Sequence, residues 1–257
     1  MEAGETRFSI EATSIMEVAA PGPDETSLRG VLEIKDLSVL LGGEPEQGPG
    51  MVVVFDVSPT LAVRVRSIVE VVDVASVPHY LLPSGLGDTL AALSRSAFLH
   101  KGRLYLELTA EGLPHEPGTV LPPPEHPVHV VQDTPGRSLV FESQGRLLGL
   151  PLAWVSQVVE RGPSFSALPG KGGAVAGVVP HAQALWPIYS APGMLGAPAT
   201  PETYLVLAEV SGRNLGLCAS RVLGLHPRFE PAKEPGEFLA PGLQTPVLFL
   251  DLERMFS

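Results

Sequence analysis

The sequence predicts a mostly-β protein with a few short helices, arranged as two related domains. Valine, isoleucine and leucine come in short runs that glycine and proline interrupt, which is typical of β-sandwiches and β-barrels. Segments of the first half recur in the second half, and a proline-rich stretch separates the two. A repeat of this length indicates a duplicated domain, because the units of a solenoid are much shorter.

The duplication is visible in the apolar runs. Three pairs of segments match: Met51–Val74 with Tyr204–Leu225, Ile15–Val18 with Val155–Val158, and Leu104–Leu108 with Leu248–Leu252. The offset between partners is 140 residues at the front, 153 to 154 in the middle and 144 at the end. Since the offset changes only between apolar runs, insertions fall in loops, as expected for two copies of one fold.

The predicted domains are residues 1–113 (the first copy) and 136–257 (the second copy), joined by a linker at residues 114–135. The linker contains seven prolines, and proline at this density favours an extended backbone and excludes helix. The first copy has 16 acids and 8 bases, a net charge of −8, whereas the second has nine of each. The first domain is therefore acidic and the second is close to neutral.

Ten strands are predicted from apolar and β-branched runs bounded by turn residues. In chain order they are Arg7–Ile10, Val52–Val57, Leu61–Val65, Val69–Val74, Arg103–Leu108, Ser138–Ser143, Leu147–Pro151, Tyr204–Val210, Leu215–Ala219 and Val247–Leu250. Five short helices of one or two turns are predicted at Ala12–Val18, Leu37–Leu41, Asp88–Arg95, Ala153–Val159 and Leu252–Phe256.

The composition argues against several kinds of partner. A formal net charge of −11 without clustered Lys or Arg argues against nucleic acid and anionic lipid. No apolar run approaches the roughly 20 residues that span a bilayer, and the N-terminus has no signal-peptide pattern. The single cysteine, Cys218, lies in an apolar run and is expected to be a small buried side chain in a reducing compartment. We therefore expect a cytoplasmic protein without direct membrane insertion.

No catalytic, metal or cofactor site is predicted. The nearest matches to the paired Asp-Thr/Ser-Gly loops of aspartic proteases are Asp88–Leu90 and Asp133–Pro135, and both lack the glycine that brings two carboxylates together. The sequence contains no nucleophile elbow, phosphate loop or zinc-binding His-Glu-x-x-His pattern. A binding module is the preferred interpretation, and a degenerate β-barrel hydrolase is the enzymatic alternative.

The second copy presents an ordered series of motifs. It comprises Ser138–Glu142, Leu147–Pro151, Val155–Val158, Leu185–Ile188, Leu205–Val210, Gly216–Leu225 and Val247–Phe256. In this order the series resembles the CheW-like domain of bacterial chemotaxis coupling proteins, and the first copy is similar from Arg7 to about Gly112. The resemblance implies two CheW-like domains, each a pair of small five-stranded SH3-like β-barrels.

The same resemblance implies a function. It predicts a non-enzymatic adaptor that binds a histidine kinase regulatory domain, the cytoplasmic tips of chemoreceptors, or both, in receptor arrays. Both copies depart from the family at polar positions, since Arg66 and Ser220 stand where an aspartate is usual. The alternative is therefore a scaffold or localisation factor of another pathway that no longer binds kinase or receptor.

Candidate protein-binding residues also follow from the resemblance. The family's receptor-facing Asn-Leu-Arg-Gly signature is similar to Ser27–Gly30, whereas the second copy has Pro180–Gln183 at this place. The residues that match binding positions of the family are Ile15, Glu17, Arg29, Gly30, Val155, Gln157 and Gly216. Arg29 as a solvated loop residue, and Ile15 and Val155 as core residues, remain alternatives.

The first domain is predicted to lack its first strand. The second copy has Ser138–Ser143 ahead of its Leu147–Pro151 strand, whereas only six residues precede Arg7. A barrel without a strand leaves backbone donors and acceptors unpaired at an edge. We expect this edge to pair with Val128–Gln132 of the linker, or with a strand that a partner protein adds.

Overall fold

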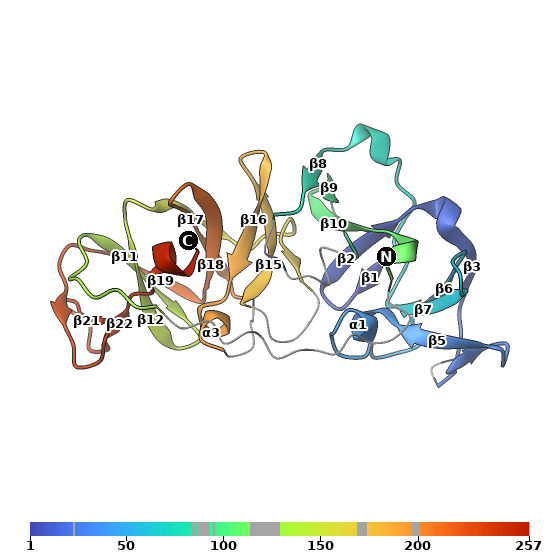
Figure 1. Ribbon diagram of the computed structural model, residues 1–257, viewed down its shortest axis with the longest axis horizontal. Coiled ribbons are helices and arrows are strands. Elements are labelled where there is room, and N and C mark those ends of the chain that lie inside the picture. Colours follow the sequence, from blue (N-terminus) through green and yellow to red (C-terminus); the bar gives the residue numbers. More distant parts are fainter. Residues whose placement is uncertain are drawn as a thin grey trace. The chain divides into compact units, whose positions relative to one another are not determined.

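The computed structural model describes residues 1–22, 24–83, 86, 93–94, 96–113, 129–168, 174–196 and 201–256. The described chain is mostly β with short helices (Figure 1), which confirms the predicted fold class. The predicted helix Asp88–Arg95 lies almost entirely outside the described residues, as does most of the predicted linker. Among the described residues, no helix has the length and apolar character needed to cross a membrane.

The chain forms two compact units. Unit 1 consists of Met1–Pro122, Pro163–Lys171 and Val178–Leu185, and unit 2 of Pro123–Gly162, Gly172–Gly177 and Trp186–Ser257. Unit 1 therefore includes two segments of the second copy. From these segments Val178 and Leu185 are buried in the same apolar cluster as Phe8 and Phe55. The first copy thus completes its core with side chains from the other half of the sequence.

The first sheet of the first copy has the strand order β1-β2-β10-β9-β8. These strands are β1 Glu2–Ala3, β2 Thr6–Ile10, β10 Arg103–Leu108, β9 Ser96–His100 and β8 His79–Leu81. The pair β2–β10 is parallel and the other pairs are antiparallel. The sheet therefore joins the start of the copy to its end.

The second copy repeats this sheet with one further strand, in the order β19-β11-β12-β22-β21-β20. The strands are β19 Arg221–His226, β11 Ser138–Ser143, β12 Arg146–Pro151, β22 Val247–Leu248, β21 Glu237–Leu239 and β20 Glu230–Pro231. Again the pair that joins the start to the end, β12–β22, is parallel. The order matches the first copy strand for strand from β11 onward.

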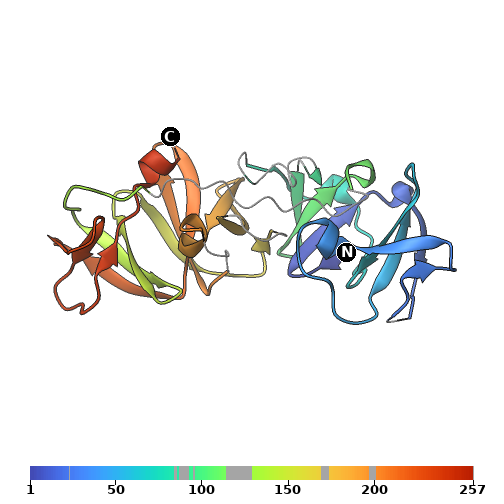
Figure 2. The same ribbon diagram turned by 60° about the horizontal axis from the view of Figure 1, so that its bottom comes forward.

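A second sheet is present in each copy (Figures 1 and 2). Its order is β3-β6-β7-β5-β4 in the first copy and β13-β17-β18-β16-β15-β14 in the second. The first-copy strands are β3 Ile15–Ala19, β6 Met51–Phe55, β7 Leu61–Val65, β5 Leu32–Asp36 and β4 Ser27–Leu28. The second-copy strands are β13 Val155–Glu160, β17 Tyr204–Val210, β18 Arg213–Ala219, β16 Ala184–Tyr189, β15 Val175–His181 and β14 Ser166–Ala167. The pairs β5–β7 and β16–β18 are both parallel.

Short helices follow equivalent strands and have polar caps. Helix α1, Leu37–Leu40, begins after β5, where the Asp36 carboxylate accepts a hydrogen bond from the Val39 N–H at 3.2 Å. Helix α3, Ala191–Met194, begins after β16 with Ser190 as its cap. Helix α4, Leu252–Met255, is capped by Asp251. Such caps satisfy amide groups that a one-turn helix cannot pair internally.

Two of the predicted helices are wrong. Residues 12–18 form a single 3₁₀ turn, Ala12–Ser14, followed by strand β3, and residues 153–159 contain strand β13. In β3, Ile15 pairs with Phe55, and in β13, Val155 pairs with Ala208. Hydrogen bonding to a buried neighbouring strand therefore outweighs the weak local preference for helix.

The predicted absence of a first strand is corrected to a short one. Strand β1 occupies the place of β11 with two residues, because Ala3 pairs with Thr6 as Ser143 pairs with Arg146. The predicted strand Val69–Val74 is also wrong, since these residues lie in no described strand.

The linker segment that was expected to complete the first domain lies elsewhere. The Val131 N–H donates to the Phe249 carbonyl at 3.1 Å, and the Asp251 N–H donates to the His129 carbonyl at 2.8 Å. Val130 forms a bridge with Leu250. Residues 129–131 therefore extend the β22 region of unit 2, and they do not pair with the first domain.

Aromatic side chains pack against one another at the first sheet of the second copy. The Phe249 ring lies 4.9 Å from Phe229 and 5.6 Å from Phe238, centroid to centroid, and both contacts are edge-to-face. A Cβ atom built on Gly149 would lie 2.1 Å from the Phe249 ring. Glycine on β12 is therefore required for the ring to lie over the sheet.

We predict that Gly149→Ala destabilises the protein. The added methyl group overlaps the Phe249 ring, and overpacking of this kind costs about 1–3 kcal/mol. Thermal and urea unfolding of the variant measure the loss. The matched control is Gly162→Ala, because nothing lies within 4 Å of a Cβ built there. Equal stability of the two variants would contradict this account of the packing.

Candidate functional site

The loop between β4 and β5 positions the predicted binding residues Arg29 and Gly30. Both have positive φ angles, 54° and 68°. In the second copy Ala182 and Gln183, between β15 and β16, have φ angles of 48° and 64°. The left-handed conformation is unfavourable for residues other than glycine, so its retention at three such positions indicates that the tight strand connection imposes it.

Arg29 contacts the edge strand β3. Its Nη2 atom lies 2.5 Å from Oε1 of Glu17, and the Arg29 side chain is 74% exposed. The ion pair thus joins the β4–β5 loop to β3. Exposed ion pairs contribute only about 0–1 kcal/mol, so a partner carboxylate can replace Glu17 at small cost. The remaining guanidinium donors can bind further acceptors.

Exposed apolar side chains lie close to Glu17 and Arg29 in the sequence. Met16 on β3 is 60% exposed, and Val31 in the β4–β5 loop is 90% exposed. Strand β3 pairs with β6 and is the terminal strand of its sheet. We call residues 15–19 together with residues 29–31 the β3 edge. It combines a free strand edge, aliphatic groups and a salt-bridged arginine, which are features of protein-binding surfaces.

The equivalent strands share an irregularity. The register of β3 shifts between Ile15 and Glu17, and that of β13 shifts between Val155 and Gln157. Each shift places one extra residue in the edge strand, a β-bulge. The structure therefore aligns Glu17 with Gln157, as the sequence predicted. A glutamine cannot form the ion pair, and Ala182 provides no cation in the second copy.

Three of the predicted binding residues are partly or fully buried. Ile15 and Val155 are half-buried against the apolar clusters of the first and second copies. Gly216 is buried in β18, and a Cβ there would lie 2.5 Å from Cδ1 of Ile188 and 3.0 Å from Cδ2 of Leu207. Gly216 therefore lies away from the exposed surface, and its role in the structure is close packing.

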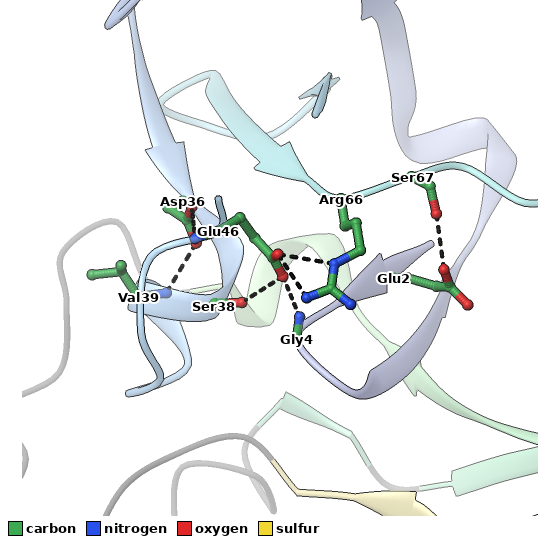
Figure 3. Close-up of polar contacts among 8 residues, drawn as sticks. All are labelled: Glu2, Gly4, Asp36, Ser38, Val39, Glu46, Arg66 and Ser67. Carbon is green, nitrogen blue, oxygen red and sulfur yellow. Dashed lines mark hydrogen bonds and ion pairs between the residues drawn. The ribbon is translucent and has the colours of Figure 1, made fainter. Parts of the chain in front are cut away.

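A buried carboxylate that the sequence did not predict holds the first copy together (Figure 3). The Glu46 side chain is 4% exposed and accepts hydrogen bonds from the Gly4 N–H, Oγ of Ser38 at 3.1 Å and Nε of Arg66 at 3.1 Å. Its own N–H donates to Oδ2 of Asp36 at 2.9 Å. Glu46 therefore connects the β1–β2 turn, helix α1 and the end of β7, and the surrounding donors fix it as a structural anion.

The second copy has an equivalent. Glu202 accepts a hydrogen bond from Oγ of Ser143 and another from the Gln144 N–H at 2.9 Å. Glu46 lies in the loop ahead of β6 and Glu202 in the loop ahead of the equivalent strand β17, and both bind the first hairpin turn of their copy. Glu46 lies five residues before β6 and Glu202 two residues before β17. This difference in spacing hides the correspondence in the sequence.

The remaining ionisable groups include a buried thiol. Burial raises the pKa of the Cys218 thiol to about 12, so the thiol stays protonated and unreactive. Among the described residues, no group of three or more His, Cys, Asp or Glu side chains is arranged to hold a metal ion. Asp88, in one of the two segments that failed to match the aspartic-protease loop, lies outside the described residues.

Comparisons with known proteins found two similarities. Residues 137–257 match the family model described as the CheW-like domain. The second copy is thus similar to this family over its whole length. A solved structure described as the scaffolding protein TtCheW from Thermoanaerobacter tengcongensis is similar at 19% identity and a TM-score of 0.40. The similarity covers 48% of this chain and 93% of that chain. No curated protein matches the chain.

The second copy differs from the first at the positions that form the β3 edge. It has Ala182 and Gln157 where the first copy has the ion pair of Arg29 and Glu17. The two halves thus share a sheet order and an edge bulge, and differ in the charged groups presented there.

We predict that Glu46→Gln lowers the free energy of unfolding by about 1–3 kcal/mol. A neutral amide loses the charge-assisted hydrogen bond to Arg66 and cannot accept from all of the surrounding donors. Denaturant unfolding monitored by circular dichroism tests this. Glu11→Gln, at an exposed position of the same copy, is the matched control and should leave the stability unchanged.

We also predict a pH dependence at His79. Its Nε2 atom lies 2.9 Å from the Val74 carbonyl and its Nδ1 atom 3.2 Å from Oε2 of Glu107, and both contacts raise the pKa of His79 above 6.5. A raised pKa means that the contribution to stability is complete below pH 6.5 and is lost as the pH rises through the folded-state value. NMR titration of the imidazole should give a midpoint above 6.5. In His79→Asn, the stability deficit should be larger at pH 5.5 than at pH 8.5, and a pH-independent deficit would contradict the assignment.

Proposed function

We propose that this protein is a non-enzymatic adaptor of a chemotaxis-like signal transduction system. It acts in the cytoplasm, at receptor arrays, and couples a histidine kinase regulatory domain, chemoreceptor tips, or both through protein–protein contacts. The observation that carries the proposal is the β3 edge of the first copy, where Arg29 projects from a constrained loop into solvent. The family of the second copy, whose members act as coupling proteins, supports the pathway.

The chemistry of the β3 edge fits such a partner. Coiled-coil receptor tips present carboxylates and main-chain carbonyls, which a planar guanidinium binds through several donors. Glu17 holds the guanidinium ready in the free protein, and the exposed ion pair dissociates at little cost. Met16 and Val31 provide apolar area beside it. Binding therefore requires no rearrangement of the loop.

Two copies in one chain add a further property to the adaptor. If each copy binds its own partner, the linker converts the second binding event into an intramolecular one, and the effective concentration rises. The two edges carry different groups, so we propose that they select different partners. The first copy supplies the arginine contact, and the second supplies a neutral edge.

A second candidate function is a scaffold in another pathway. It is favoured by the polar positions that differ from the family pattern. Arg66 stands where an aspartate is usual and pairs with Glu46, and Ala182 stands in place of an arginine in the second copy. In this case neither kinase nor receptor binds. The two functions differ in what Arg29 contributes to recruitment.

The test is isothermal titration calorimetry of the full chain with the regulatory domain of the cognate kinase and with a receptor cytoplasmic fragment. We expect at least one of them to bind, and Arg29→Ala to weaken that binding about tenfold through loss of a charge-assisted hydrogen bond of about 1.5 kcal/mol. Arg103→Ala, at an exposed position on β10, is the control. Binding of neither partner would reject the proposal and favour the second function, and binding unchanged by Arg29→Ala would exclude Arg29 from the contact.

A further inference from the structure

A pocket lies beside β19, the terminal strand of the first sheet of the second copy. Its volume is about 440 Å³. Strand β19 contributes residues 221–223 and His226 to one wall, and the turn after β21 contributes residues 241–243 to the other. All of these residues belong to unit 2, so the pocket lies within one compact unit.

The pocket follows the free edge of β19. This strand pairs with β11 on one side, and no other described strand pairs with it. Successive side chains of a strand point to opposite faces of the sheet. Because the consecutive residues 221–223 all line the pocket, it lies along the edge of the strand and not over one face. Such an edge presents main-chain N–H and C=O groups to an added strand.

The middle of β19 is open to a second backbone. The register with β11 shifts between Val140 and Phe141, and the shift leaves Leu223 as an extra residue, a β-bulge. Gly224 follows with a φ angle of 122°, and nothing lies within 4 Å of a Cβ atom built there. Glycine at such a place in a strand allows the close approach of another main chain.

The two walls of the pocket are fixed before any partner binds. In the turn, the Leu243 N–H donates to the Ala240 carbonyl at 3.1 Å, and Gly242 has a φ angle of 84°. Leu223 and Leu243 both pack against the buried cluster that contains Phe249. A preformed site of this kind lowers the entropy that binding must remove.

The ionisable side chains that line the pocket are basic. They are Arg221 and His226, and the residues of the opposite wall lie in a stretch, 238–247, without any charged residue. Arg221 pairs with Glu142 of β11, with Nη2 at 2.8 Å from Oε2, and its side chain is still 68% exposed. An exposed pair contributes only about 0–1 kcal/mol, so a carboxylate from a partner can share or replace Glu142. The groups at the site therefore favour an acidic occupant.

We propose that this pocket is a docking site for an acidic segment of a partner protein, which adds as a strand to the free edge of β19. The main chain of the segment pairs with β19, an apolar side chain enters between Leu223 and Leu243, and a carboxylate binds Arg221. The main-chain groups of the edge favour a peptide over a small anion, because only a peptide pairs with them along the strand. The site does not involve Arg29 or the β3 edge, so the proposal goes beyond the proposed function.

The test uses the full chain and a dye-labelled peptide, Glu-Val-Glu-Leu-Glu-Val-Glu, followed by fluorescence anisotropy. We expect saturable binding, and slower amide exchange at residues 221–226 when the peptide is bound. The control peptide has lysine in place of every glutamate and should bind at least about tenfold more weakly. The chain has a net charge of −11, so general electrostatic attraction would produce the opposite preference.

Two pairs of variants locate the site. Arg221→Ala should weaken binding of the acidic peptide about tenfold through loss of a charge-assisted hydrogen bond. Its matched control is Arg146→Ala, because Arg146 is 50% exposed and pairs with Glu237 at 3.1 Å but does not line the pocket. Pro241→Glu places an acid at the wall and should also weaken binding, whereas Gln244→Glu, at an exposed position outside the lining, should not.

A modified peptide separates strand addition from contacts of side chains alone. N-methylation of the leucine keeps the side chain and removes one main-chain donor, and should weaken binding at least about tenfold. Absence of saturable binding, equal or stronger binding of the lysine peptide, or binding that survives Arg221→Ala or N-methylation would overturn the proposal. Self-association of the chain that the acidic peptide reverses, measured by sedimentation, would overturn the choice of partner and assign the site to a second copy of this chain.

Discussion

Each copy is closed by a parallel pair between its second strand and its last strand, and the rest of the fold depends on these pairs. β2 pairs with β10, and β12 pairs with β22, although about 100 residues separate the partners in both cases. Parallel neighbours require a long connection between them. Here the connection contains the whole second sheet of the copy. The second sheet is therefore an insertion into the first, and the first sheet is complete only when the chain returns to it.

This arrangement explains which positions have diverged between the copies. Residues that face the apolar clusters, such as Phe8 and Phe141, are buried in both. The anions Glu46 and Glu202 both hold the first hairpin turn, although they lie at different distances from the next strand. The exposed edges carry different groups, with an ion pair in the first copy and neutral side chains in the second. The differences are thus concentrated at the exposed edges, where we propose that partners bind.

The sequence by itself determined the mostly-β fold class and the short helices at Leu37 and Leu252, because the strands are apolar runs bounded by turns and the helices have acidic caps. It also located the loop that holds Arg29, because the Ser27–Gly30 motif is contiguous in the sequence. Only the tertiary structure decided that residues 15–19 and 155–160 are edge strands, that residues 129–131 join unit 2, that Gly216 is buried and that Glu46 is a central anion. The reason is physical. Strand pairing, burial and ion pairing are interactions between residues far apart in the chain, and local propensity carries no information about which distant segment becomes the neighbour.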